Sequence, residues 1–212
     1  MTRAIWWAAL LAGASYMLAV MGDWQGPLIT VWKGASIGLL ALWAAMQAQS
    51  RDGWQIAAVL AVGATGDVLL NIYGLKVGAI AFVIAHLIAI ELYVRNRRPT
   101  LSVSQRALAW LLVPATAIIT WAIAAPNPDW PIAVGYVVIA AVMAATAWLS
   151  RFPRYRTGIG ALLFVASDLA IFGGQAELLP VELRRVAVWP LYFAAQALIA
   201  WGVVRTLRGE RV

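Results

Sequence analysis

The 212-residue sequence contains no cysteine, a single histidine and few charged residues. The absence of cysteine excludes a disulfide framework, a thiolate metal site and a cysteine nucleophile. With His86 as its one histidine, the chain alone cannot form a histidine-rich zinc site. Charged residues make up 12% of the chain, whereas a soluble domain has about 25%. The sequence therefore has too little polar surface to cover a water-soluble fold.

Hydrophobic residues are abundant instead, at 63% of the chain, and the mean hydropathy is +0.81. A helix that crosses the hydrocarbon core of a bilayer needs about 20 apolar residues, with a range of about 17–25. Read with that window, the sequence predicts an all-α, polytopic membrane protein with eight transmembrane helices in one transmembrane domain over residues 1–212. The predicted spans cover residues 4–21, 28–48, 54–72, 77–94, 106–125, 131–149, 158–173 and 187–205.

The distribution of lysine and arginine predicts the orientation of these helices, because cytoplasmic loops carry an excess of both. If the N-terminus is cytoplasmic, most of the 16 lysines and arginines fall inside, and the outside set is Lys33, Lys76, Arg184 and Arg185. We therefore expect both termini in the cytoplasm, a bacterial-type inner membrane, and a first span that is retained rather than cleaved as a signal peptide. Contacts with anionic lipid headgroups then account for the net charge of +7, so we expect no nucleic-acid partner, and no protein partner is evident.

Tryptophan is frequent, with 12 residues in the chain. Its amphipathic ring is enriched where the hydrocarbon core of a membrane meets the headgroups. We therefore expect the tryptophans near the ends of the predicted spans to anchor the helices at the two membrane surfaces, with no further role. They include Trp24, Trp54, Trp130, Trp148 and Trp189.

A weak internal repeat relates the first four predicted spans to the last four, at an offset of about one hundred residues. A Ser-Arg pair follows both the second and the sixth span, and a run of small residues precedes both Asp67 and Asp168. Because each unit has an even number of spans, a 4+4 repeat would be parallel, with a pseudo-twofold axis along the membrane normal. A chance similarity between apolar helices would explain the same pattern. If the repeat is real, the two aspartates occupy equivalent positions.

Few polar side chains lie inside the predicted spans. An ionisable group at the centre of a membrane helix costs about 2.5–3.5 kcal/mol on insertion scales, so it faces the bundle interior. At a rise of 1.5 Å per residue, Asp67 lies about 20 Å and Asp168 about 15 Å from the cytoplasmic end, and Lys33 about 6–8 Å from the outer end. This common depth predicts one polar cavity. The polar residues that share it also include Asn71, His86, Tyr192 and Gln196.

Each of these residues also has a purely structural interpretation. Lys33 would serve the structure alone if its amine snorkelled to the outer interface. His86, Tyr192 and Gln196 would do so if they formed hydrogen bonds between helices. The two aspartates would do so if they formed a buried pair with Lys33 or His86. The residues alone leave these interpretations open beside the functional ones.

Two carboxyl groups in one dry cavity cannot both stay ionised, so a protonated acid would lie beside an anion. Such a pair suits hydrolysis through an oxocarbenium-like cation, in which one group gives a proton and the other stabilises the cation and activates water. It suits a proton-coupled transporter or flippase for a small amphiphile equally well. A third possibility is a non-catalytic scaffold in which the polar residues only hold helices together.

Five motifs occur in order along the chain and together resemble the YhhN family of membrane proteins, which includes the lysoplasmalogenases. The likeness covers nearly the whole chain from the second span onward. Two departures, Gly34 and Ala89, stand where the family usually has proline and tyrosine. The motifs are Gly66-Asp67-Val68-Leu69-Leu70, Phe82-x3-His86, Pro131-x4-Tyr136, residues 160–168 ending in Ser167-Asp168, and Pro190 with Tyr192 and Gln196.

The resemblance implies an eight-span enzyme that hydrolyses the vinyl ether bond of lysoplasmalogens to a fatty aldehyde and a glycerophospho-base, without a metal or cofactor. The substrate would be a lysophospholipid among bilayer lipids, and Lys33 could hold its phosphate as a point charge. One aspartate would be the acid, although the sequence does not say which. The candidate catalytic residues are Asp67 and Asp168, and the candidate substrate-binding residues are Lys33, Asn71, His86, Tyr136, Tyr192 and Gln196.

Overall fold

The computed structural model describes residues 2–209, and over these residues the chain forms eight long α-helices and one π-helical turn. Over the same residues, each long helix, together with the π-helical turn in the case of α7, has the length and hydropathy to cross a membrane. The predicted all-α fold with eight transmembrane spans is thus confirmed. The elements are α1 (Thr2–Met21), α2 (Pro27–Ala45), α3 (Arg51–Tyr73), α4 (Leu75–Arg95), α5 (Val103–Ala124), α6 (Trp130–Leu149), η1 (Arg154–Gly158), α7 (Ile159–Gln175) and α8 (Val181–Leu207).

The start of α8 differs most from the predicted spans, and the end of α2 and the starts of α3 and α5 each differ by three residues. α2 stops at Ala45 rather than at 48, and α8 starts at Val181 rather than at 187. A hydropathy window leaves out the first turns of α8 because Arg184 and Arg185 lower its average. These turns are helical nevertheless, and Glu182 in the first turn complements the helix dipole. α8 is therefore long enough to carry charged side chains beyond its apolar part.

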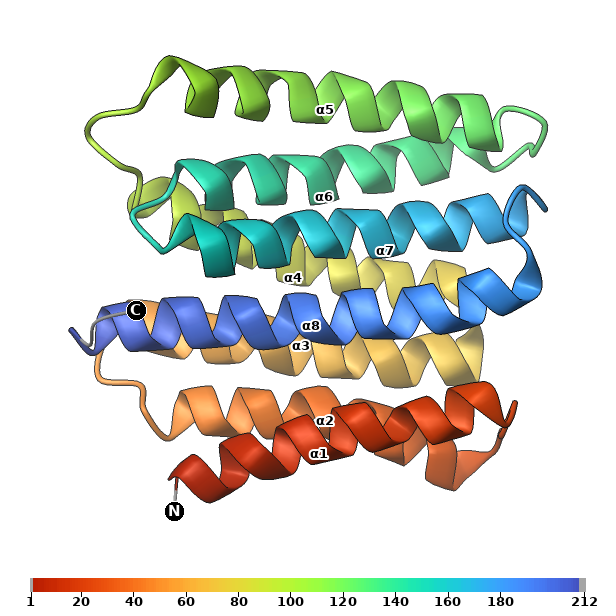
Figure 1. Cartoon of the computed structure of the whole chain (residues 1–212), viewed down its shortest axis with the longest axis horizontal. Helices are drawn as coiled ribbons and strands as arrows, with labels where there is room; N and C mark the ends of the chain where they lie inside the picture. The colour runs from red at the N-terminus through yellow and green to blue at the C-terminus, as the bar shows by residue number, and fades with distance from the viewer. Residues whose placement is uncertain (1, 210–212) are drawn as a thin grey trace.

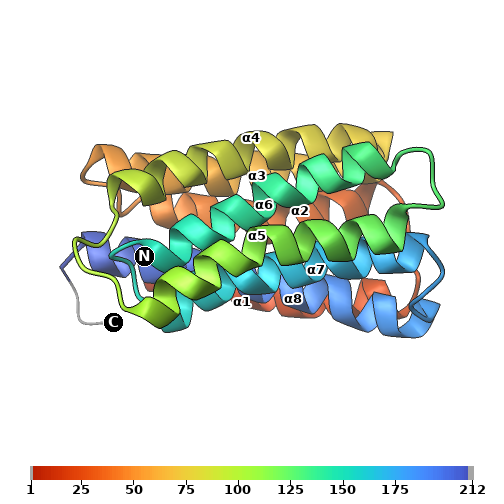
Figure 2. The same ribbon diagram turned by 90° about the horizontal axis from the view of Figure 1, so that it is seen from above.

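The helices lie side by side along the long axis of the molecule, with α5 at one edge and α1 and α2 at the other (Figure 1). Helices that follow one another in sequence pack together, except α4 and α5, and Gly74 (φ 85°) makes the one-residue turn between α3 and α4. The two halves of the chain meet where α4 packs on α6 and where α8 packs on α1, α2 and α3. Figure 2 shows α4 on one side of the bundle and α1 and α8 on the other. The position of α8 brings its side chains to α3.

The two ends of the bundle differ in charge. α1 begins and α8 ends at the same end, where the loops 46–50, 96–102 and 150–153 also lie (Figure 1). We call this the arginine-rich end, and there Arg95 pairs with Asp52 and, at 2.9 Å, with Glu91. The distal end carries the loops 22–26, 125–129 and 176–180. The side of the membrane that each end faces stays a prediction.

The tryptophans fall into two groups. Trp24 and Trp54 are 53% and 60% exposed. Trp189 is buried instead, where its Nε1 donates a 2.8 Å hydrogen bond to the carbonyl of Gly13 and its ring centroid lies 4.4 Å from that of Tyr16. The expectation that Trp189 anchors a helix end at the membrane surface is therefore wrong. Because α8 starts at residue 181, Trp189 lies within the helix and packs it against α1.

Candidate active site

A chain of polar contacts surrounds Asp67 on α3. Its Oδ1 lies 3.3 Å from Nζ of Lys33 on α2, and its Oδ2 accepts a 2.7 Å hydrogen bond from the hydroxyl of Tyr192 on α8. Gln196, one turn further along α8, donates from Nε2 to the same Tyr192 oxygen at 3.3 Å. Asp67, Tyr192 and Gln196 are all buried. The contacts tie three helices to one carboxylate.

Small residues on α3 make room for this arrangement. Gly63 lies one turn before Asp67, and a Cβ at this position would lie 3.1 Å from Nε2 of Gln196. A Cβ at Gly66 would lie 3.1 Å from the ring of Phe82 on α4. Both distances are tighter than ordinary van der Waals contact, so a side chain at either glycine would push the polar or aromatic neighbour away. The glycines thus let α4 and α8 approach the helix that carries the aspartate.

Lys33 contacts two polar side chains of α3. Its side chain is 13% exposed, and besides Asp67 its amine donates a 3.3 Å hydrogen bond to Oδ1 of Asn71, one turn beyond Asp67 on α3. Asn71 in turn donates from Nδ2 to the hydroxyl of Thr30 at 3.4 Å. Asn71 itself is exposed. Of the two structural alternatives for this lysine, snorkelling or a buried pair, the structure has the pair with Asp67.

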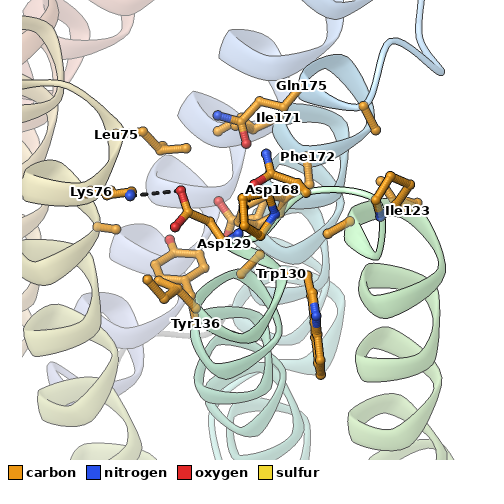
Figure 3. A pocket seen from close by; sticks show the side chains of 18 of the residues that line it. Leu75, Lys76, Ile123, Asp129, Trp130, Tyr136, Asp168, Ile171, Phe172 and Gln175 are labelled. Carbon is orange, nitrogen blue, oxygen red and sulfur yellow. Dashed lines mark hydrogen bonds and ion pairs between the residues drawn. The ribbon is translucent and has the colours of Figure 1, made fainter.

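Asp168 on α7 has a different environment. It is buried, its Oδ2 has no hydrogen-bond partner, and no ion pair reaches it within residues 2–209. Tyr136 of α6 lies beside it, and both are drawn in Figure 3. The preceding residue, Ser167, donates a 3.0 Å hydrogen bond from its hydroxyl to the carbonyl of Val188 on α8. This bond fixes α7 against α8 next to a carboxyl oxygen that has no hydrogen-bond partner among the described residues.

Two cavities meet at Asp168, both near the distal end. The larger, of about 800 Å³, lies between α3, α4, α5, α6 and α7 and is shown in Figure 3. The smaller, of about 370 Å³, lies between α1, α2, α3, α4, α7 and α8, and Lys33 and Asp67 line it. Both volumes lie in the range of about 300–1,000 Å³ that is typical of ligand sites. Asp168 lines both cavities, as do Leu70, Leu75, Phe82, Ile171 and Gln175.

An aromatic cluster connects the surroundings of the two aspartates. The ring of His86 on α4 lies edge-on to Phe164, with centroids 4.8 Å apart, and 5.9 Å from Tyr136. Phe164 and Phe82 pack edge-to-face on Tyr192, at 5.3 Å and 5.8 Å. His86 is buried and lines neither of the two cavities, and among residues 2–209 its Nε2 has no hydrogen-bond partner. Its observed contacts are therefore those of a packed ring.

The sequence-based candidates omit several residues that line the smaller cavity. Tyr16 reaches it from α1, and Arg184 and Arg185 reach it from the start of α8. Arg185 pairs with Asp23 at 2.9 Å, while no ion pair of Arg184 is present within residues 2–209. The two arginines fall before the predicted span 187–205 and so resembled loop charges. The sequence signal that could have identified them is that two adjacent arginines occur on the predicted outer side, which otherwise has few positive charges.

The arrangement offers one fixed negative charge and one group that can exchange a proton on the same cavity wall. Asp67 is held on both oxygens by Lys33 and Tyr192, whereas Asp168 presents an oxygen without a hydrogen-bond partner within residues 2–209. In the part of the chain that the structure describes, no three histidine, aspartate or glutamate side chains are grouped as metal ligands. Acid–base chemistry is thus what the observed side chains can supply.

Comparisons with known proteins agree with the resemblance to the YhhN family. The model of the YhhN family matches residues 28–203. Two curated relatives, each named lysoplasmalogenase, come from Mycobacterium bovis (strain ATCC BAA-935 / AF2122/97) and Mycobacterium tuberculosis (strain CDC 1551 / Oshkosh). Each is 31% identical over 180 residues, covering 81% of this chain and 68% of the relative. No solved structure gives a significant match. The family match spans most of the helical bundle and both aspartates, and the chain belongs to the YhhN family.

Proposed function

We propose that this multi-pass membrane protein is a hydrolase that cleaves the vinyl ether bond of lysoplasmalogen-type lysophospholipids. The products are a fatty aldehyde and a glycerophospho-base. The observation that carries the proposal is that Asp67 and Asp168, from α3 and α7, line one cavity while only Asp67 is ion-paired. The family and the printed name of the curated relatives support the substrate class.

The contacts support different roles for the two aspartates. A buried charge needs a counter-ion and hydrogen bonds to be tolerated. Asp67 has both, in Lys33 and Tyr192, so we assign it as the anion. Asp168 has no ion pair within residues 2–209 and an oxygen without a partner, so we assign it the proton. Lys33 then fixes the anion rather than binding phosphate.

In this mechanism Asp168 transfers its proton to the enol ether carbon that does not carry oxygen, which leaves an Asp168 carboxylate and an oxocarbenium ion. The negative charge of Asp67 stabilises this cation. Water then attacks the cationic carbon while the Asp168 carboxylate takes one of its protons, which restores the acid and forms a hemiacetal. The hemiacetal C–O bond to glycerol breaks, and the hydroxyl proton passes to the glycerol oxygen. One water is consumed, and aldehyde and alcohol are released.

The experiment is an assay of aldehyde release by purified protein in nanodiscs, with 1-alkenyl lysophosphoethanolamine as substrate and its 1-acyl analogue as control. We expect aldehyde from the alkenyl lipid and no hydrolysis of the acyl lipid. Asp168→Asn should abolish most of the activity, and Glu182→Gln, which changes an exposed carboxylate in the first turn of α8, should leave it unchanged. Full activity in Asp168→Asn would contradict the proposal.

The two alternative functions give different results in the same preparation. A carrier would release no aldehyde and would show substrate-dependent proton flux in liposomes. A scaffold would show neither activity, and substitution of an aspartate would change only its thermal stability.

We further propose that the arginine-rich end faces the cytoplasm of a bacterial-type inner membrane, because positive charge favours that side. The chain has no cysteine, so a single introduced cysteine reports on one position alone. Arg106→Cys, at an exposed position near the start of α5, should react with a membrane-impermeant thiol reagent only after the cells are opened. Labelling of intact cells at this position would reverse the orientation.

A further inference from the structure

Three cations lie on the wall of the smaller cavity, namely Lys33, Arg184 and Arg185. Lys33 is neutralised by Asp67 at 3.3 Å, and Arg185 by Asp23 at 2.9 Å. Arg184 is partly buried, and no carboxylate pairs with it in the described part of the chain. With Asp168 protonated, the wall of the cavity therefore carries one positive charge, that of Arg184, which no carboxylate of the described residues neutralises. A bound anion would neutralise it.

The packing of Arg184 holds its side chain against the protein. A Cβ at Gly174, near the end of α7, would lie 2.1 Å from Cδ of Arg184 and 3.2 Å from its Nε. The stem of the arginine thus occupies the space that the missing side chain of the glycine leaves. This contact, together with its partial burial, keeps the arginine on the cavity wall between α7 and α8.

The distance between Arg184 and the aspartates fits the length of a lysophospholipid headgroup. Along α8, Arg184 lies eight residues before Tyr192, which is about 12 Å at a rise of 1.5 Å per residue. Tyr192 contacts Asp67. In a lysoplasmalogen, seven bonds separate the protonated enol ether carbon from phosphorus, or about 8 Å in an extended chain. The side chain of the arginine can cover the remaining distance.

We propose that Arg184, flanked by Arg185, binds the phosphodiester of the substrate in the smaller cavity, while the alkenyl chain occupies the larger one. This inference rests on the proposed function. A guanidinium group binds phosphate oxygens through two parallel hydrogen bonds. The enol ether would then lie at the junction of the two cavities, where Asp168 is. The larger cavity suits a hydrocarbon chain because its wall is rich in apolar side chains, among them Leu70, Ala79, Ile123, Ile132, Ile171 and Phe172.

The test compares 1-alkenyl lysophosphoethanolamine with 1-alkenylglycerol, which has a hydroxyl group in place of the phosphoethanolamine group. Arg184→Gln should raise KM for the phospholipid about tenfold or more, with kcat nearly unchanged, because it removes a charge-assisted contact distant from the reacting atoms. The same variant should leave kcat/KM for 1-alkenylglycerol unchanged. Arg184→Lys should recover part of the loss. Arg106→Gln, which removes one exposed positive charge from α5, is the matched control.

The outcomes separate this inference from the proposed function. Wild-type protein that releases aldehyde from neither substrate would overturn the proposed function and this site with it. Activity with an unchanged KM in Arg184→Gln, or an equal loss on both substrates, would overturn the phosphate site alone. If Arg184→Gln does not fold, inhibition of the wild type decides the question. Glycerophosphoethanolamine should then inhibit competitively and glycerol should not, and equal inhibition by both would overturn the site.

Discussion

Asp67 and Asp168 share a cavity wall and a similar depth, yet their surroundings differ. Both are buried, at 2% and 5% exposure. Asp67 is held by a lysine and a tyrosine, whereas Asp168 keeps an oxygen that no residue in the described part of the chain contacts by a hydrogen bond. A carboxylate that is held on both oxygens is suited to remain charged, and a carboxyl with a free oxygen is suited to move a proton. Two acidic residues in similar sequence settings can thus divide the acid and anion roles between them.

The largest effect is expected for the substitution that tests Asp168 as the acid. Asp168→Asn should lower kcat for aldehyde release by about 10²-fold or more, the usual contribution of a general acid. Its melting temperature should fall little, because no cation is left without a counter-ion among the described residues. Aldehyde assays and thermal unfolding of the same preparation measure both. A loss of activity matched by a large loss of stability would show that Asp168 is structural.

Asp67→Asn should lose activity to a similar extent, about 10²-fold, and should also lose stability. Removing one partner of a buried ion pair costs about 3–5 kcal/mol in soluble proteins, and the partly accessible Lys33 reduces this to about 1–3 kcal/mol. The double variant Asp67→Asn with Lys33→Met removes the stranded charge, so it should regain stability without regaining activity. Recovery of both in the double variant would show that the pair serves the fold alone.

Tyr192→Phe tests the hydrogen bond that distinguishes Asp67 from Asp168. The substitution keeps the ring contacts with Phe82 and Phe164 and removes the donor to Oδ2 of Asp67. A hydrogen bond to a charged group contributes about 1.5–3 kcal/mol. Because Lys33 still pairs with Asp67, we expect the lower value, a fall in kcat/KM of about tenfold. Steady-state kinetics of the variant measure this. An unchanged rate would mean that Lys33 alone fixes the anion.

The smallest effect is expected at His86. Its observed contacts are ring packing against Phe164 and Tyr136, and its Nε2 bonds to no residue in the described range 2–209. His86→Leu keeps an apolar group of similar size, so we expect kcat/KM to change by about threefold or less. A drop of about 10²-fold in the same aldehyde assay would instead identify His86 as a proton carrier for Asp168.

The number of spans, and the similar level of Lys33, Asp67 and Asp168 along the bundle, could be predicted from the sequence. Helix length follows from the thickness of the bilayer, and depth follows from the fixed rise per residue. The same depths brought Lys33, Asp67 and Asp168 to one slab of the membrane. The rotation of each helix about its own axis has no such rule, so the pairing of Lys33 with Asp67 stayed one of several alternatives. Packing of α2 and α8 on α3 decides it.

Residues at the start of α8 could not be assigned from hydropathy. Arg184 and Arg185 lower the average of any window that contains them, so the predicted helix began at 187 and placed Trp189 at its end. In the structure the helix begins at Val181. Trp189 is therefore buried within the helix, and both arginines line the smaller cavity. A hydropathy average cannot detect helical turns whose charged side chains line a cavity.

The placement of both cavities near one end of the bundle gives the proposed reaction a direction. With the arginine-rich end in the cytoplasm, the soluble glycerophospho-base would leave toward the exterior, and the aldehyde would dissolve in the surrounding lipid. Hydrolysis would thus be vectorial. The cell would retain the hydrocarbon part of each lipid for further metabolism, and recovery of the polar part would require separate uptake.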